Sequence, residues 1–266
     1  MNTKILKISE NSIPTAKEVC VFLADYCARL LASGATCIRL DKNIARIASA
    51  YGMDADMTVM PHHIHLTVTD NSNGEIVTSI SSVPETGINF AINTNLSRLS
   101  WLIADEKITF CDAIHKFEKI IAATPEGKWM VLFLVTIANA SFCRLFGGDF
   151  VAMAIVAFAT FVGYYLKTAL LHNKVDTRVV FIICSFVSSV LGATDMLFSI
   201  GTTPEIALGT SVLYLVPGIP FLNSFSDLLY RHYLCAFSRF MDAVILTCCL
   251  SLGLCAGMSL MHAGMF

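Results

Sequence analysis

Five apolar segments follow one another in the second half of the chain, and each is about as long as a helix that spans a bilayer. About 20 consecutive apolar residues are needed to cross the hydrocarbon core as a helix. Only helices and closed barrels satisfy all their backbone hydrogen bonds in lipid, so the segments predict a membrane all-α bundle of about five transmembrane helices. The segments are Trp129–Phe146, Asp149–Leu171, Val179–Ile200, Pro204–Leu222 and Leu234–His262.

Charged residues are concentrated in the first half of the chain. Residues 1–128 contain 12 Lys or Arg and 14 Asp or Glu, whereas residues 129–266 contain 6 and 6. This change predicts a domain boundary near Pro125–Gly127, with a cytosolic domain over 1–127 and a transmembrane domain over 128–266. The formal net charge of −2 gives no reason to expect a nucleic-acid partner. The ten cysteines contain no CxxC pair and lie mostly in apolar runs, so we interpret them as reduced and structural.

The first domain combines helical and extended patterns. Apolar residues recur at helical spacing over Val19–Leu31, and an Asp-Asn-Ser-Asn-Gly turn at Asp70–Gly74 indicates a hairpin. A small α+β domain, large enough for its own core, is therefore expected. The other expected helices cover Asp41–Tyr51, Asn95–Ala104 and Thr109–Ala123, and the expected extended segments cover Met57–Met60, Ile64–Thr69, Ile76–Ile80 and Ile88–Ile92.

Three histidines, His62, His63 and His65, lie together at the edge of one of these expected strands. His63 and His65 would share one face, but no cysteine is nearby, and a zinc site needs three or four ligands with supporting hydrogen bonds. Clustered histidines at the edge of a strand are more often polar surface. We therefore expect no metal and no other cofactor, and a metal enzyme built on these histidines is the weakest of the functions considered.

Two prolines interrupt the fourth apolar segment. Pro217 and Pro220 lack the N–H group that a continuous helix uses, and Gly218 between them loosens the backbone. Such a break is tolerated in a bilayer only where protein or a water-lined cavity satisfies the freed carbonyls. Asn223 and Asp227, four residues apart, would follow on one helical face. This combination is typical of solute transport paths.

Other polar residues in or beside the apolar segments are further candidates for substrate binding or gating. An ionisable group in lipid is costly unless it faces protein or water. The alternative is that such a residue lies at the membrane interface and extends its charged end into water. For Arg144, Asp149 or Asp242 taken alone the alternative is favoured, whereas for Asn223 and Asp227 a transport role is favoured. The further candidates are Arg144, Asp149, Asp195 and Arg239.

The distribution of basic residues predicts the orientation. Lys167, Lys174 and Arg178 lie in or beside the second-to-third loop, Arg231 lies in the fourth-to-fifth loop, and the third-to-fourth loop has no basic residue. Because basic loops favour the cytoplasmic side, the first domain is predicted to be cytoplasmic and the C-terminus to lie outside. Arg144, in a short outer loop, is the exception.

Three motifs together resemble the threonine/serine exporter family. The sequence SVLYLVPGIPFLNSFSDLL at Ser211–Leu229 resembles the family signature, and FCRLFGGDF at Phe142–Phe150 resembles its first membrane hairpin. The sequence GIN at Gly87–Asn89 resembles a pattern late in its cytosolic domain. The resemblance covers nearly the whole chain, in the split form of the family. It departs at Tyr230–His232, where the family usually has a small or glycine-containing segment.

The resemblance implies an exporter of small organic solutes in the bacterial inner membrane. Family substrates include threonine and serine, and the split form is associated with the dicarboxylate succinate. It also implies that a separate small membrane protein supplies a second membrane portion, in a homo- or hetero-oligomer. No catalytic or nucleotide-binding motif is recognised, so we expect no enzyme, and coupling to a gradient. The alternative function is a membrane-embedded regulatory or assembly subunit whose cytosolic domain senses a ligand.

The same resemblance suggests a mechanism for the broken segment. Unwinding at Pro217–Pro220 would leave a half-helix N-terminus near Phe221–Asn223, whose N–H groups suit a carboxylate. Asn223 would hydrogen-bond the substrate, and Asp227 would bind an amino group or exchange a proton. Arg144 or Arg239 would balance a second carboxylate.

Overall fold

The computed structural model describes residues 14–60, 62–84, 87–106, 108–123, 127–198 and 201–261. The predicted turn at Pro125 and Glu126, and the expected end of the last apolar segment at His262, lie outside these residues. Contacts between elements divide the chain into two compact units. The first unit is Met1–Thr124 with Ile219–Phe240, and the second is Pro125–Gly218 with Met241–Phe266.

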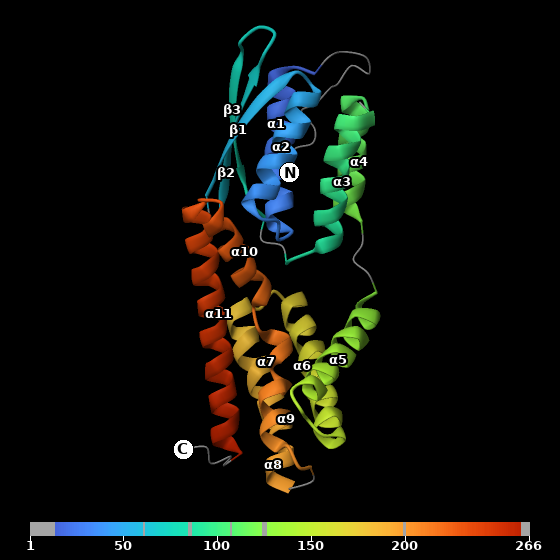
Figure 1. Ribbon diagram of the computed structural model, residues 1–266, viewed down its shortest axis with the longest axis vertical. Coiled ribbons are helices and arrows are strands. Elements are labelled where there is room, and N and C mark those ends of the chain that lie inside the picture. The colour runs from blue at the N-terminus through green and yellow to red at the C-terminus, as the bar shows by residue number, and fades with distance from the viewer. Residues whose placement is uncertain are drawn as a thin grey trace. The chain divides into compact units, whose positions relative to one another are not determined.

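A three-stranded antiparallel sheet in the order β1-β2-β3 packs against the helices of the first unit (Figure 1). The central strand buries Ile64, Leu66 and Val68 on alternate positions, which gives the sheet one face for the core. The predicted turn joins the second and third strands, and the Asp70 carboxylate accepts the Ser72 N–H at 2.8 Å. The strands are β1 (Met53–Val59), β2 (His63–Asp70) and β3 (Ile76–Ser82).

Four helices of the first unit form its core with the sheet. Thr15 and Glu18 form a capping box at the start of the first helix, which satisfies two N–H groups that a helix end leaves free. All four expected helices are present, but the extended segment expected at Ile88–Ile92 is wrong, because the third helix already begins at Phe90. The helices are α1 (Ala16–Ala32), α2 (Cys37–Ala50), α3 (Phe90–Glu106) and α4 (Phe110–Ala122).

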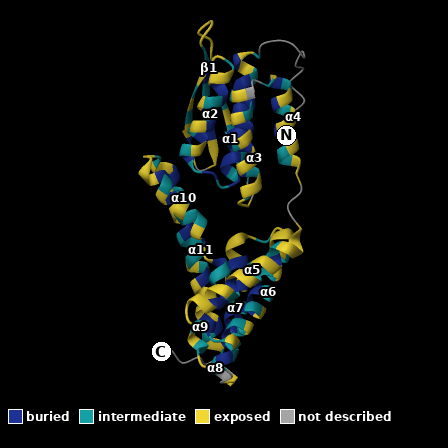
Figure 2. Ribbon diagram, turned by 45° about the vertical axis from the view of Figure 1, so that its right-hand side comes forward, coloured by how far each residue is buried: buried dark blue, intermediate teal, exposed yellow. Residues whose placement is uncertain are grey.

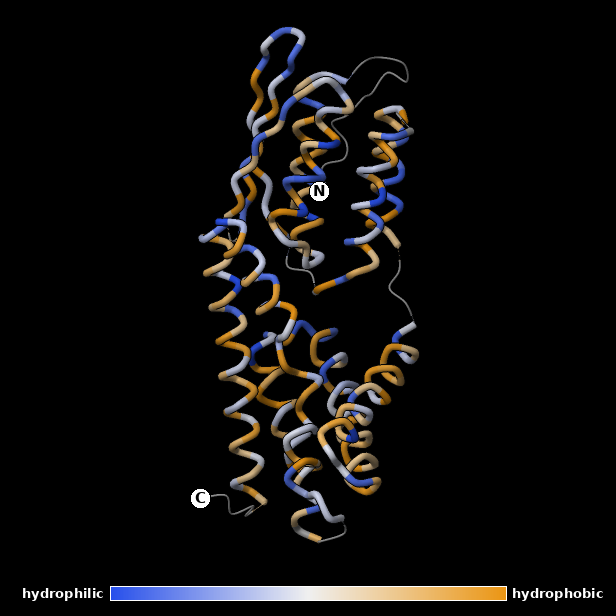
Figure 3. Tube along the Cα trace, in the orientation of Figure 1, coloured by the Kyte–Doolittle hydropathy of each residue, from blue (hydrophilic) through white to orange (hydrophobic). Residues whose placement is uncertain are grey.

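Most of the remaining helices are apolar, and several of them are long (Figure 3). Among the described residues, four helices can cross a membrane by length and composition, at Lys128–Leu145, Phe150–His172, Thr177–Met196 and Tyr233–Leu260. A fifth span is possible if the bent pair Pro204–Leu215 and Gly218–Leu229, which turns by 61°, counts as one. The elements are α5 (Lys128–Leu145), α6 (Phe150–His172), α7 (Thr177–Gly192), α8 (Thr194–Phe198), α9 (Pro204–Ser211), η2 (Leu213–Leu215), α10 (Gly218–Leu229) and α11 (Tyr233–Leu260).

Small residues line the packing surface of α7 in the second unit. Ser185 and Ser189 are fully buried on α7, and Gly253 and Gly257 of α11 lie against them with no room for a side chain. Close packing through small residues is how helices associate in lipid. Large apolar side chains such as Trp129 remain exposed on α5 (Figure 2), as expected for a surface that faces lipid.

Candidate functional site

The polar face of α10 bonds to the loop between α1 and α2 in the first unit. The Asn223 amide donates to the Gly34 carbonyl oxygen at 2.9 Å. One turn later, Asp227 Oδ1 accepts the Cys37 N–H at 2.8 Å. The prediction that Asn223 and Asp227 share one helical face is therefore confirmed, and the partner of that face is backbone of Gly34 and Cys37 in the same unit.

Asp227 is fully buried, and both of its carboxylate oxygens have donors. Arg239, on α11, donates from Nη1 to Asp227 Oδ2 at 2.8 Å and from Nη2 to the Ala35 carbonyl oxygen at 2.7 Å. A buried ion pair is tolerated when further hydrogen bonds offset its desolvation in this way. Thr36, the N-cap of α2, makes no side-chain cap bond. Asp227 supplies that cap instead, and its negative charge suits the positive end of the helix dipole.

The break in the fourth segment is shorter than expected. Pro217 lies between η2 and α10, and α10 begins at Gly218, so Pro220 is the third residue of the helix. The first N–H groups of a helix have no intrahelical acceptor, so proline costs little in the first turn. The half-helix N-terminus expected near Phe221–Asn223 is therefore wrong, because the helix starts one turn earlier.

A buried asparagine supports the other side of the break. Asn139 on α5 donates from Nδ2 to the Thr210 carbonyl oxygen at 3.1 Å, at the end of α9, and to Thr160 Oγ1 at 2.6 Å. Asn139 is 3% exposed. A protein side chain thus bonds a backbone carbonyl where the helix stops, which is the condition for a broken helix in a bilayer.

Cys37, Asp227 and Cys235 form the one group of three possible metal ligands within the described part of the chain, with their ligand atoms within 4.8 Å of one another. The donor set does not fit a metal cation. Both Asp227 oxygens already accept hydrogen bonds, and the Arg239 guanidinium would repel a cation. The Cys37 thiol forms a hydrogen bond with Cys235 and is buried, and both effects raise the pKa of this thiol. A metal binds the thiolate, which a raised pKa disfavours. None of His62, His63 and His65 belongs to this group.

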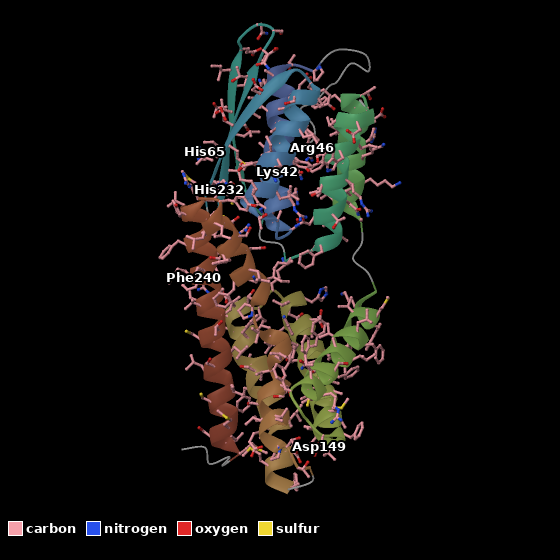
Figure 4. The ribbon with its side chains drawn as sticks, in the orientation of Figure 1. Lys42, Arg46, His65, Asp149, His232 and Phe240 are labelled. Atoms are coloured by element: carbon pink, nitrogen blue, oxygen red, sulfur yellow. The ribbon has the colours of Figure 1, made fainter. Side chains whose placement is uncertain are left out.

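Asp149 belongs to a second polar cluster, which lies in the second unit (Figure 4). Its Oδ1 accepts the Ala152 N–H at 2.6 Å as the N-cap of α6, and its Oδ2 accepts from the Thr202 N–H at 2.6 Å and hydroxyl at 2.9 Å. These hydrogen bonds, first that from Ala152, lower the pKa of Asp149. The carboxylate therefore ties the start of α6 to the loop before α9.

Asp195 approaches the same loop but keeps one oxygen unbonded. Its Oδ1 accepts the Gly201 N–H at 2.6 Å, whereas Oδ2 has no hydrogen-bond partner among the residues that the structure describes. Asp195 is fully buried. A Cβ atom on Gly201 would lie 2.7 Å from Asp195 Oδ2 and 3.0 Å from Asp149 Oδ2. Glycine is therefore the residue that lets both carboxylates approach this point.

Arg144 does not join either cluster through any hydrogen bond found within the described residues. Its Nη1 donates to the Gly148 carbonyl oxygen at 3.0 Å, and its guanidinium lies 5.4 Å from the centre of the Phe150 ring. Arg144 thus stabilises the hairpin between α5 and α6. The candidate residues fall into two groups: one around Asp227 and one around Asp195.

The family assignment follows from comparison with known proteins. A family model described as "Putative threonine/serine exporter" (ThrE) matches residues 21–261. The chain belongs to the ThrE family. A relative from Klebsiella aerogenes named "Probable succinate transporter subunit YjjP" is 26% identical over 243 residues, which cover 91% of this chain and 92% of the relative.

A second relative with the same name, from Escherichia coli K12, is 27% identical over 220 residues, which cover 82% of this chain and 85% of the relative. No solved structure matches the chain. Membership of the ThrE family, together with these relatives, supports a membrane exporter subunit.

Sequence reasoning missed the loop that receives the polar face of α10. Gly34, Ala35 and Cys37 contribute backbone groups to it, and backbone groups leave no mark in the residue types. No residue type signals this contact, because Thr36 is an ordinary N-cap residue and only the structure shows that Asp227 replaces it as the acceptor.

Proposed function

We propose that the chain is one subunit of a secondary exporter that moves small organic solutes out of the cytoplasm across the bacterial inner membrane. The solute is a dicarboxylate such as succinate, or threonine or serine. The observation that carries this proposal is the break at Pro217 in an apolar segment. Before the break, the buried Asn139 bonds the Thr210 carbonyl, and after it the part-buried Asn223 bonds the Gly34 carbonyl. A membrane anchor needs no such break.

The same proposal covers orientation and partner. Basic residues in the loops favour a cytoplasmic N-terminal domain and an outside C-terminus. A separate small membrane protein similar to YjjB would supply a second membrane portion, and the name of the relatives, which describes a subunit, is consistent with a partner. In the absence of a recognised nucleotide-binding motif, export would be driven by an ion or solute gradient.

Within this proposal, the two clusters have different roles in gating. The polar side chains of the first group already bond to one another and to backbone of Gly34 and Cys37. This group comprises Pro217, Gly218, Pro220, Asn223, Asp227 and Arg239. It would gate rather than contact the solute. The group of Asp149 and Asp195 would take part in binding, because Asp195 Oδ2 has no partner among the described residues. Arg144 would stabilise the adjoining hairpin.

Efflux from liposomes tests the proposal. The chain is reconstituted with and without the partner, and release of succinate, threonine and serine is measured for Asn223→Ala. We expect the variant to lose export while remaining folded, because it loses one hydrogen bond to Gly34. Asn173→Ala, at an exposed loop position, is the matched control. Normal efflux from Asn223→Ala would contradict the assignment.

The liposome measurement also separates the alternative function, a regulatory or assembly subunit. A transport subunit is required for flux. If the partner alone gives full flux, and this chain only changes its rate when a ligand is added, the regulatory alternative is correct.

A further inference from the structure

A pocket of about 400 Å³ lies in the first unit between α2, α3 and the residue that follows α10. Its volume is at the small end of the range for small-molecule sites, which is about 300–1,000 Å³. The polar residues that carry the argument are Arg39, Lys42, Asn43, Arg46, Ser97 and Tyr230.

The pocket is lined by three cationic side chains and by no acidic one. Arg39, Lys42 and Arg46 follow at intervals of three and four residues, so they share one face of α2. In the part of the chain that the structure describes, none of the three forms an ion pair. The acidic residue nearest in sequence, Asp41, pairs instead with His232 at 3.1 Å. Three positive charges without a counterion attract an anion.

Neutral neighbours hold the two arginines in place. Arg46 donates from Nη1 to Ser100 Oγ at 2.6 Å and to Asn43 Oδ1 at 3.1 Å, and its guanidinium lies 3.5 Å from the centre of the Trp101 ring. Arg39 donates from Nη1 to Asn93 Oδ1 on α3 at 2.7 Å. Because each guanidinium has five N–H donors, both arginines keep donors for a ligand. Side chains fixed before binding lose less entropy when the ligand arrives.

We propose that this pocket binds a small organic dianion, with the arginines and Lys42 taking its two charged groups. Bidentate bonds between arginine and a carboxylate or phosphate are strong and specific, and a lysine supplies a point charge. Figure 4 shows Lys42 and Arg46 on the stretch of α2 that faces α3. A dicarboxylate and a phosphate share this chemistry, and the volume excludes a large ligand.

The pocket adjoins the Asp227 cluster. Thr36, in its lining, directly precedes the Cys37 N–H that bonds Asp227, and Tyr230 directly follows α10. A ligand here touches both α2 and the segment after α10, so it would stabilise their contact. The inference deepens the proposed function by naming the class of solute that the N-terminal domain recognises, and to that extent it rests on that function.

Calorimetric titration of the full-length protein in detergent tests the inference. The probes are succinate, inorganic phosphate and, as a zwitterion, threonine. We expect saturable binding of succinate that weakens about tenfold in Lys42→Gln and in Arg46→Gln, because each removes a charged hydrogen-bond donor. Lys42 is exposed and has no hydrogen bond within the described residues, so Lys42→Gln tests the site even if Arg46→Gln does not fold. Lys116→Gln, at an exposed position of α4 in the same unit, is the matched control.

Each outcome decides the inference. Succinate binding that both variants weaken supports a dicarboxylate site, and phosphate binding with the same dependence, without succinate binding, supports a dianion site that serves phosphate. Binding of neither anion, equal binding of threonine, or binding that both variants leave unchanged overturns it. If the variants weaken binding but the chain carries no flux in liposomes, the pocket stands and the exporter proposal fails.

Discussion

Two fully buried carboxylates, Asp227 in the first unit and Asp195 in the second, differ in how far their bonds are satisfied. Asp227 accepts from Arg239 and from the Cys37 N–H, so each oxygen has a donor. Asp195 accepts one N–H, from Gly201, and its second oxygen has no partner among the described residues. Burial is the same in both cases. Hydrogen bonding among the described residues, rather than burial, therefore distinguishes a carboxylate that holds elements together from one that is still able to bind a ligand.

A second carboxylate, that of Asp149, lies near the same glycine as the Asp195 carboxylate. Asp195 Oδ2 and Asp149 Oδ2 approach the same point beside Gly201. Two carboxylates at one site repel each other unless a cation or a proton lies between them. We therefore expect the Asp149–Asp195 pair to attract a cation, whereas Asp227 already has Arg239 as its counterion.

The largest expected effect is a loss of stability at Asp227, whose two carboxylate oxygens both accept hydrogen bonds. Arg239→Met leaves Asp227 buried without its counterion, and we expect the free energy of unfolding to fall by about 3–5 kcal/mol. Thermal and denaturant unfolding of the purified protein measure the loss. The double variant Asp227→Leu with Arg239→Met removes both charges and should recover much of it. A single variant as stable as the wild type would show that the pair does not hold these elements together.

The next largest expected effect is a loss of efflux at Asp195, one oxygen of which has no partner among the described residues. Asp195→Asn keeps the shape of the side chain but removes its negative charge and so weakens cation binding. We expect efflux to fall at least tenfold while the unfolding temperature stays the same or rises. Asp176→Asn, at an exposed N-cap where asparagine serves equally well, is the control. Unchanged efflux in Asp195→Asn would remove Asp195 from the transport path.

A smaller effect is expected at the glycine between the two carboxylates. Gly201→Ala places a methyl group 2.7 Å from Asp195 Oδ2, so one carboxylate must move, and we expect a partial loss of efflux. Gly209→Ala is the matched control, because an added Cβ on Gly209 meets nothing within 4 Å. Equal efflux from the two variants would show that the approach of Asp149 and Asp195 is not needed.

The sequence predicts the parts of this comparison that depend on local spacing. Helical periodicity gives the long apolar helices, and the prolines give the break. The i, i+4 rule places Asn223 and Asp227 on one face. The partners of this face come from residues far away in the chain: Cys37 bonds Asp227 across 190 positions, and Gly34 bonds Asn223 across 189. Such pairings depend on the packed fold, which residue spacing does not encode.

The smallest expected effect tests whether the cysteines beside Asp227 are structural. Cys37→Ser should change the free energy of unfolding by about 1 kcal/mol or less, because Asp227 accepts the backbone N–H of residue 37 and not its thiol. The bond that caps α2 therefore survives the substitution. Metal analysis of the purified protein accompanies the unfolding measurement. If zinc copurifies with the wild type and is lost from Cys37→Ser, then Cys37, Asp227 and Cys235 hold a metal. Asp227 would then differ from Asp195 by its metal and not by its hydrogen bonds alone.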